Sequence, residues 1–248
     1  MGCVGSDHHG DTLKEVAEKA GLTTVYQIKQ ESSTGKCAIL LTTTGRSMVA
    51  SLGASQEFSL KQLEQTEFHS HIEKAQIICS EGFFIASSRE AFMEVASYAH
   101  SHKKIFCMTL SAKYIVEKGF GNWLLAALQY ADFVFGYEEV SIRESPKLLL
   151  KRPRTVLITR RTERTLVATK DNIKEYQWKS PPTIVDSHGC REAFAGGFLA
   201  YVALNKSIDA CVDAGLYCAY ESLKYNGCQF PENVSYNPGT FVSDTEQK

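Results

Sequence analysis

Short, continuously apolar segments recur along this chain, and helical patterns follow the first of them. Ile77–Cys79 precedes an amphipathic stretch at Ser88–His100, and Ile105–Leu110 precedes another near Trp123–Tyr130. Strands that are apolar on both faces are typical of parallel sheets, because helices cover both faces of such a sheet. The pattern therefore predicts an α/β fold with a mostly parallel central sheet sandwiched by helices.

Alternating apolar and polar residues indicate a different kind of segment near the N-terminus. Thr24–Gln30, Cys37–Thr43 and Ser47–Leu52 all alternate, and Gly35 and Gly45 fall between them. Alternation with a period of two is typical of strands with one face in solvent, and glycine favours the turns that join them. We therefore expect a small antiparallel meander here.

The remaining elements follow from the same patterns: continuous apolar runs or alternation for strands, and a period of 3.6 residues for helices. The 248 residues, 44% of them hydrophobic, are enough for one large domain with a core. The expected elements are strands at Phe133–Phe135 and Thr155–Thr159, a hairpin of Arg164–Ala168 with Ile173–Trp178, and helices at Thr12–Ala20, Leu60–Ile72, Glu192–Ala203 and Ser207–Tyr225.

Charge and cysteine content argue against several classes of protein. The 27 basic and 28 acidic residues give a net charge of -1, so nothing favours nucleic acid or an anionic membrane as a partner. The eight cysteines form no CxxC pair and mostly lie in apolar runs, which is typical of reduced, buried thiols. No apolar run approaches the roughly 18 residues that span a bilayer. We therefore expect a cytoplasmic protein; a nuclear location, a protein partner and the oligomeric state stay open.

The first residues have two interpretations. Met1–Ser6 matches the N-myristoylation pattern, with Cys3 as a palmitoylation site. Alternatively, Cys3–Gly5 ends a buried strand. We favour the strand, because a six-residue pattern is loose.

The segment Asp186–Phe194 follows the apolar run Thr183–Val185 and leads into the apolar helical stretch Ala193–Leu199. A turn that opens a helix presents backbone N–H groups and the positive end of the helix dipole to an anion. Gly189 allows the backbone angles that such a turn needs. Glu192 falls on the first helical turn, where a carboxylate can accept a proton from a substrate hydroxyl. The alternative is that Glu192 only complements the helix dipole.

A family resemblance rests on this segment and on several others. Asp186–Phe194 resembles the pattern Asp-Thr-Asn-Gly-Ala-Gly-Asp-Ala-Phe of the ribokinase-like sugar and nucleoside kinases. Further segments are similar to the adenosine kinases of that family and extend the resemblance over essentially the whole chain. They are Gly2–Asp7, Thr34–Ala38, Arg46–Ser47, Ala50–Leu52, Gly82–Phe84, Leu110–Ala112, Ala193–Leu199 and Gly227–Glu232.

The resemblance implies a fold and a reaction. The fold is ribokinase-like, with residues 1–23 and 53–248 as the α/β domain and residues 24–52 as the remnant of a small β lid. The reaction is transfer of the γ-phosphoryl group of the co-substrate ATP, with Mg²⁺, to the 5′-hydroxyl of adenosine, which gives AMP in purine salvage. Adenosine and ATP are thus the implied partners.

The resemblance also implies roles for individual residues. Glu192 takes the position of the catalytic base, and Phe84 lines the nucleoside pocket. The anion hole for the ATP phosphates comprises Asp186, Gly189, Cys190 and Arg191.

Several departures from the family pattern fall on the chemistry. Glu192 is one methylene longer than the family's Asp, and a misplacement of ~1 Å can slow a reaction by about 10²-fold. Arg191 replaces a glycine, and its side chain could either clash with the phosphates or pair with them. The Asn-x-x-Glu element that organises Mg²⁺ reads Tyr137 and Val140, so we expect no metal ligands there. The Thr-x-Gly turn of the nucleotide site reads Thr159–Arg161.

Compared with the family, the chain is also expected to start after the first strand, a ribose-binding Asp and a Gly-Gly segment, and so to be incomplete at its N-terminus. The loop around Glu144–Lys147 is expected to be short. Three interpretations stay open: an adenosine kinase, weak if active; a pseudokinase that binds a nucleotide, a nucleoside or a partner protein; and a fragment.

Overall fold

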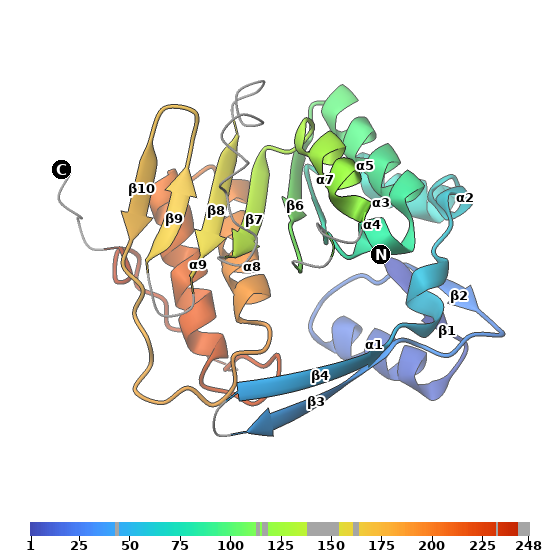
Figure 1. Cartoon of the computed structure of the whole chain (residues 1–248), viewed down its shortest axis with the longest axis horizontal. Coiled ribbons are helices and arrows are strands. Elements are labelled where there is room, and N and C mark those ends of the chain that lie inside the picture. Colours follow the sequence, from blue (N-terminus) through green and yellow to red (C-terminus); the bar gives the residue numbers. More distant parts are fainter. Residues whose placement is uncertain are drawn as a thin grey trace. The chain divides into compact units, whose positions relative to one another are not determined.

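The computed structural model describes residues 1–42, 45–112, 115, 119–137, 154–160, 164–231 and 233–242, and it divides into two compact units (Figure 1). Unit 1 comprises Met1–Phe106 and Tyr114–Tyr130, and unit 2 comprises Cys107–Lys113 and Ala131–Lys248. None of the described helices is both long enough and apolar enough to cross a membrane.

Unit 1 begins with a β-α-β arrangement. Strand β1 (Gly2–Gly5) pairs in parallel with β2 (Tyr26–Lys29), and helix α1 (His8–Lys19) lies between them in the sequence. The expectation that Thr24–Gln30 joins an antiparallel meander is therefore wrong. Alternation predicts that this segment is a strand, but the intervening helix makes the connection a crossover, which is how parallel strands are joined.

The rest of the expected meander is a separate hairpin. Strands β3 (Lys36–Thr42) and β4 (Gly45–Ser51) pair antiparallel as their own two-stranded sheet, with Lys36 opposite Ser51.

Asp7 fixes the connection between these first elements. Its Oδ1 accepts hydrogen bonds from the Gly10 N–H (3.0 Å) and the Thr34 hydroxyl (2.6 Å), and its Oδ2 accepts one from the Thr34 N–H (2.9 Å). The Thr34 oxygen in turn accepts a bond from the Gly5 N–H at 3.0 Å. These hydrogen bonds hold the pKa of the Asp7 carboxyl well below its ordinary value.

Helices make up most of the remainder of unit 1. The expected helix at Leu60–Ile72 is divided into α2 (Leu60–Leu63) and α3 (Thr66–Lys74). Ser88 caps α5 by position alone, because its side chain makes no capping hydrogen bond. The other elements are the 3₁₀ helix η1 (Gly53–Glu57), β5 (Ile77–Ser80), α4 (Phe84–Ser87), α5 (Arg89–Ser101) and α7 (Gly121–Leu128).

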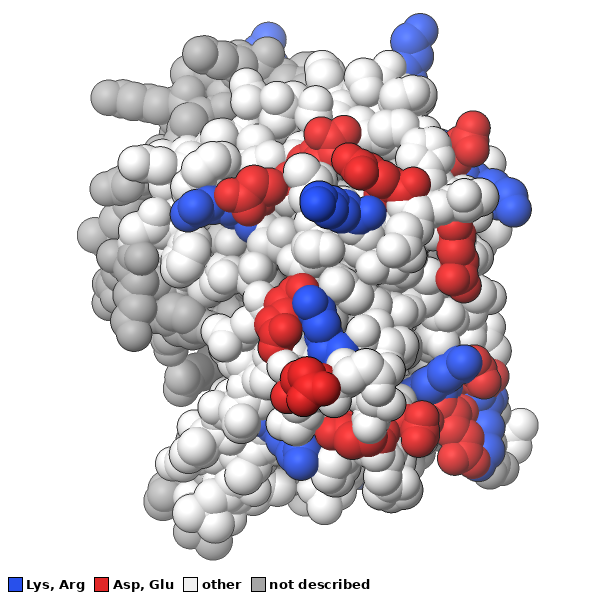
Figure 2. Space-filling model, turned by 90° about the vertical axis from the view of Figure 1, so that its right-hand side faces the viewer, with Lys and Arg blue, Asp and Glu red and all other residues white. Residues whose placement is uncertain are grey.

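On the face drawn in Figure 2, acidic and basic side chains are interspersed.

Unit 2 is built on a mixed sheet. Strand β6 (Ile105–Thr109), which begins in unit 1, β7 (Phe133–Tyr137) and β8 (Thr155–Thr159) run parallel. The expected hairpin, β9 (Thr165–Ala168) and β10 (Ile173–Tyr176), continues the sheet in antiparallel fashion. The α/β prediction is therefore confirmed, with a hairpin that makes the sheet mixed.

Helices α8 (Cys190–Ala203) and α9 (Ile208–Ser222) lie against the sheet of unit 2 (Figure 1). Phe194 and Phe198 of α8 pack edge-on against Phe135 of β7, with ring centroids 6.4 and 5.6 Å apart. A Cβ added to Gly197 would lie 2.6 Å from the Ala214 carbonyl oxygen, so the two helices pack backbone to backbone. The sheet and α9 thus hold α8 in place.

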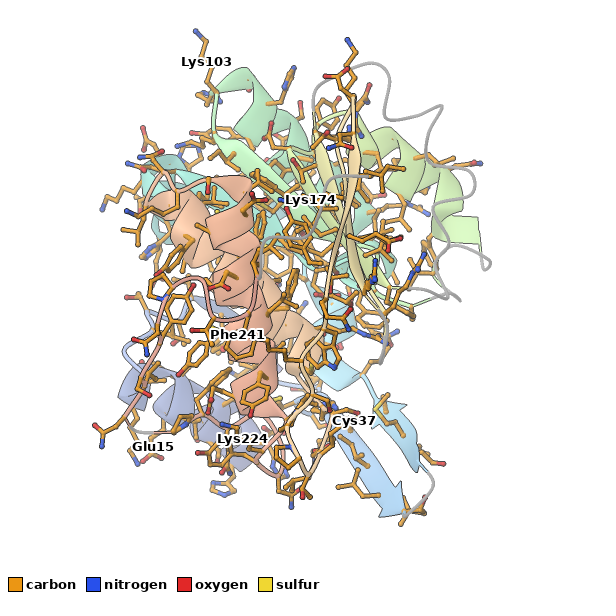
Figure 3. All side chains as sticks on the ribbon, turned by 90° about the vertical axis from the view of Figure 1, so that its left-hand side faces the viewer. Glu15, Cys37, Lys103, Lys174, Lys224 and Phe241 are labelled. Carbon is orange, nitrogen blue, oxygen red and sulfur yellow. The ribbon has the colours of Figure 1, made fainter. Side chains whose placement is uncertain are left out.

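The C-terminal segment is held on α9 by one buried carboxylate. Asp213, 1% exposed, accepts hydrogen bonds from the Tyr236 hydroxyl (2.6 Å) and from the N–H groups of Gly239 (2.8 Å), Phe241 (2.7 Å) and Val242 (2.6 Å). Phe241 lies over α9 in Figure 3.

Candidate functional site

The turn that begins α8 depends on a glycine. Gly189 is the residue before the first turn of the helix and has a φ of +76°, a left-handed conformation that glycine adopts without strain. A Cβ at this position would lie 2.6 Å from the Cys228 sulfur atom. The sequence-predicted glycine therefore occupies a place that no other residue fits without rearrangement.

Asp186 is buried and fixes the same turn from the other side. Its Oδ1 accepts a hydrogen bond from the His188 N–H at 3.0 Å, and its Oδ2 accepts one from the Gly227 N–H at 3.0 Å. The preceding residues Thr183–Val185, an apolar run in the sequence, are exposed and form no strand, so this turn does not directly follow the end of a strand. The observed geometry makes Asp186 a link between this turn and the loop at Gly227.

Glu192 lies on the first turn of α8 and is exposed. The structure records no ion pair for its carboxylate with any described residue. Burial of the thiol, together with the negative charges of Glu192 and Asp186, raises the pKa of Cys228. The two predicted carboxylates and Cys228 therefore lie near one another.

Arg191, on the same turn, contacts the last residue of β7. Its guanidinium carbon lies 3.8 Å from the centroid of the Tyr137 ring. A guanidinium over an aromatic face within about 6 Å is attracted by the ring quadrupole. Two positions that depart from the family pattern are thus in direct contact.

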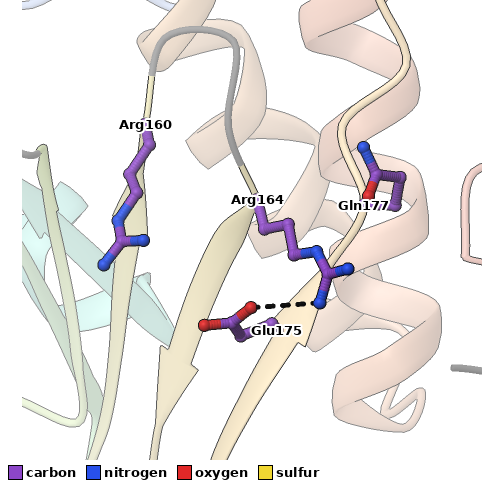
Figure 4. Close-up of a pocket in the computed structure, with 4 residues that line it drawn as sticks. All are labelled: Arg160, Arg164, Glu175 and Gln177. Atoms are coloured by element: carbon purple, nitrogen blue, oxygen red, sulfur yellow. Dashed lines mark hydrogen bonds and ion pairs between the residues drawn. The ribbon is translucent and has the colours of Figure 1, made fainter. Parts of the chain in front are cut away.

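A pocket of about 330 Å³ opens close to the end of β8 and is lined by Arg160, Arg164, Glu175 and Gln177 (Figure 4). Arg164 forms an ion pair with Glu175 at 3.2 Å across the β9–β10 hairpin. Arg160 directly follows Thr159, which pairs with Tyr137 in the sheet register. The pocket therefore lies over the ends of β8, β9 and β10, on the face of the sheet away from α9, which Tyr176 contacts.

Phe84 belongs to unit 1, at the start of α4. Its ring packs edge-on against Phe58 at 5.2 Å and lies 6.2 Å from Phe92. The neighbouring Phe83 is 44% exposed. The role of Phe84 in a nucleoside pocket stays a prediction.

Among the described residues, no cluster of metal-binding side chains is present. They hold no group of three or more His, Cys, Asp or Glu side chains that could bind a metal ion. At Tyr137, where the resemblance implies a residue that organises Mg²⁺, a phenol ring lies against a guanidinium, whereas Mg²⁺ takes oxygen ligands in octahedral geometry. Val140, the Glu144–Lys147 loop and Arg161 lie outside the described residues.

Cys228 and Gly227 are the site residues whose position the sequence did not reveal. They lie in the segment Gly227–Glu232, which the sequence analysis noted only as similar to the adenosine kinases; Glu232 is outside the described residues. The only local signal in the sequence is the glycine itself, and Gly227 has a φ of +72° in the structure. Their contact with the turn before α8 links distant parts of the sequence and leaves no trace in local periodicity.

Comparison with known proteins is consistent with this geometry. The model of the pfkB family of carbohydrate kinases matches residues 1–234. Adenosine kinase 2 of Arabidopsis thaliana is 31% identical over 259 residues, which cover 96% of this chain and 75% of that protein.

Solved structures of adenosine kinases are also similar to this chain. The adenosine kinase from Schistosoma mansoni in complex with 2-fluoroadenosine superimposes with a TM-score of 0.87 at 28% identity, covering 93% of this chain and 74% of that one. The Anopheles gambiae adenosine kinase in complex with P1,P4-di(adenosine-5) tetraphosphate also gives 0.87, at 30% identity, covering 95% and 76%.

Proposed function

Because the chain belongs to the pfkB family of carbohydrate kinases and its homologues are adenosine kinases, we propose that it is a slow adenosine kinase. It transfers the γ-phosphoryl group of ATP to the 5′-hydroxyl of adenosine, and ADP, the leaving group, and AMP are released. The observation that carries this proposal is the first turn of α8, where Gly189 keeps its left-handed conformation and Glu192 follows on the first turn.

The ligands of the homologues support this choice of substrates. One structure holds 2-fluoroadenosine, and the other holds two adenosines joined by a tetraphosphate. A nucleoside and a nucleotide are accordingly the two ligand classes to expect, with Phe84 at the nucleoside and the α8 turn at the phosphates. We place the reaction in the cytoplasm.

The roles of the α8 turn follow from its chemistry. Glu192 accepts the proton of the 5′-hydroxyl as that oxygen attacks phosphorus, because its exposed carboxylate lies on the first turn of α8, beside the proposed phosphate site. Gly189 and Cys190 present backbone N–H groups at the positive end of the helix dipole, which suits a phosphate. Asp186, whose oxygens accept backbone N–H groups, holds the turn in shape.

Two substitutions account for a low rate. The additional methylene of Glu192 moves the carboxylate by ~1 Å, which can slow a transfer by about 10²-fold. Arg191 stands where the family pattern has glycine, so the backbone of the anion hole loses the conformational freedom that a glycine gives.

A second candidate function is binding without transfer. The contact that favours it is that of Arg191 with Tyr137, since it occupies two positions at which the resemblance implies phosphate and Mg²⁺ chemistry. Such a protein would bind adenosine or ATP and form no AMP.

Isothermal titration followed by product detection tests both candidates. The purified chain is titrated with adenosine and then with ATP in the presence of Mg²⁺, and AMP is measured by chromatography. Binding of both ligands with AMP formation supports the kinase. Binding without AMP supports the second candidate, and no binding by a folded chain contradicts both.

A further inference from the structure

The pairing of Arg191 with Tyr137 brings together two positions that differ from the family pattern. The first turn of α8 carries the arginine, and the carboxyl end of β7 carries the tyrosine. Their 3.8 Å approach is among the closest geometries at which a guanidinium and a ring can stack. An exposed arginine otherwise samples many rotamers, so the ring restricts where its charge lies.

The guanidinium retains its donors while it is stacked. Arg191 is exposed, and within the described part of the chain no hydrogen bond or ion pair is recorded for it. Stacking uses the face of the guanidinium, whereas its N–H groups point outward in the guanidinium plane. That planar fork matches the oxygen atoms of a phosphate, often with two parallel hydrogen bonds.

The neighbouring strand end also carries a positive charge. Tyr137 pairs with Thr159 in the β7–β8 register, and Arg160 follows immediately. The pocket that Arg160 lines lies on the other face of the sheet, where Arg164 pairs with Glu175. Arg191 and Arg160 are thus two cationic side chains at the carboxyl ends of β7 and β8, and an anionic ligand there is favoured over a cationic one.

We propose that Tyr137 is a positioning residue, which holds the Arg191 guanidinium at the start of α8 so that it binds the phosphate groups of ATP. This inference rests on the proposed function and deepens it. Of the two roles open to Arg191, clash or pairing with phosphate, it assigns pairing. Arg191 thus stands in place of a glycine of the family pattern and Tyr137 in place of its metal-organising residue, and the two side chains stack as a pair.

Variants at the two positions separate this role from a purely structural one. Tyr137→Phe keeps the ring, Tyr137→Leu removes it, and Arg191→Gln removes the charge from an exposed side chain. ATP affinity is measured by isothermal titration without Mg²⁺ and with it, and folding is checked by thermal unfolding. Lys170→Gln, an exposed charge loss at the β9–β10 turn, is the matched control.

The expected pattern has three parts. Arg191→Gln weakens ATP binding by about 10-fold or more, in keeping with loss of a charge-assisted hydrogen bond. Tyr137→Leu weakens it by about 3- to 10-fold, and Tyr137→Phe retains the affinity. The double variant with Leu and Gln binds no more weakly than Arg191→Gln alone, because the tyrosine acts only through the arginine.

Several outcomes would overturn the inference. They are unchanged affinity in Arg191→Gln, tighter binding in Arg191→Gly, and a loss in Lys170→Gln equal to that in Arg191→Gln. Unchanged ATP affinity in a folded Tyr137→Leu would overturn it as well, and if that variant does not fold, Tyr137→Met, which keeps side-chain volume without the ring, gives the same test. The inference and the proposed function can fail separately. If ATP binding depends on Arg191 but no AMP forms, only the kinase function is rejected. If AMP forms at the same rate whichever residue stands at position 191, only the inference is rejected.

Discussion

The sulfur atom of Cys228 lies against the α-carbon of Gly189, and a Cβ added to that glycine would approach it to 2.6 Å. The residues are far apart in the sequence, yet their contact shapes the turn from which α8 starts. The loop at Gly227 is also tied to this turn through Asp186. The candidate site thus depends on the C-terminal loop as much as on its own motif.

Gly189→Ala is therefore expected to destabilise the protein. The left-handed backbone and the contact with Cys228 together should lower the free energy of unfolding by about 1–3 kcal/mol. Gly196→Ala on the same helix is the control, because no heavy atom lies within 4 Å of its added Cβ; it should raise stability by roughly 0.5–1 kcal/mol. Urea denaturation measures both, and equal stabilities would refute the account.

Glu192 is expected to set the rate of transfer. Glu192→Gln removes the proton acceptor and should abolish measurable AMP formation without unfolding the chain, since the side chain is exposed. Glu192→Asp restores the shorter carboxylate and should raise the rate by up to about 10²-fold. Single-turnover assays compare the two with Glu221→Gln, a carboxylate on α9. A wild-type rate in Glu192→Gln would show that Glu192 is no base.

Asp213 is expected to hold the C-terminal segment in place. Asp213→Asn offers a single acceptor oxygen to four donors and should lower the free energy of unfolding by about 3 kcal/mol. The exposed Asp171→Asn is the matched control and should change it by less than about 0.5 kcal/mol. Protease digestion should also cut the variant near Phe241 first; identical digestion of both variants would contradict this role.

We expect Asp7 to make the free energy of unfolding depend on pH in the acidic range. Its pKa is lowered in the folded state by hydrogen bonds from Thr34 and Gly10, below the ordinary value of 3.8. Its contribution is therefore fully present above pH 3.8 and is lost as the pH falls below that value towards the folded pKa. Thermal unfolding is measured between neutral pH and pH 2. On acidification, the unfolding temperature should fall less in Asp7→Asn than in the wild type or in Asp11→Asn. Parallel curves for all three would disprove the linkage.

Local sequence patterns predicted individual helices and strands better than they predicted which strands pair with each other. Local pattern predicted the strands at Phe133–Phe135 and Thr155–Thr159 as continuous apolar runs and the two last helices by their helical repeat, because burial imposes these patterns on strands and helices. It did not predict that β2 pairs with β1 in parallel, since a strand's own residues do not state which edge it joins.

The candidate site shows the same limit. A helix start with a glycine was predicted at Asp186–Phe194, and the structure has it there. The stacking of Arg191 on Tyr137 joins α8 to β7 and depends on tertiary packing, which no local pattern encodes.

Formation of AMP by the purified wild-type chain tests the proposed function most directly. Radiolabelled adenosine is incubated with the chain, ATP and Mg²⁺, and the products are separated. A slow kinase predicts AMP that requires ATP, accumulates with enzyme concentration and is absent with Glu192→Gln. A folded chain that binds adenosine and ATP and yields no AMP above the Glu192→Gln background would contradict it.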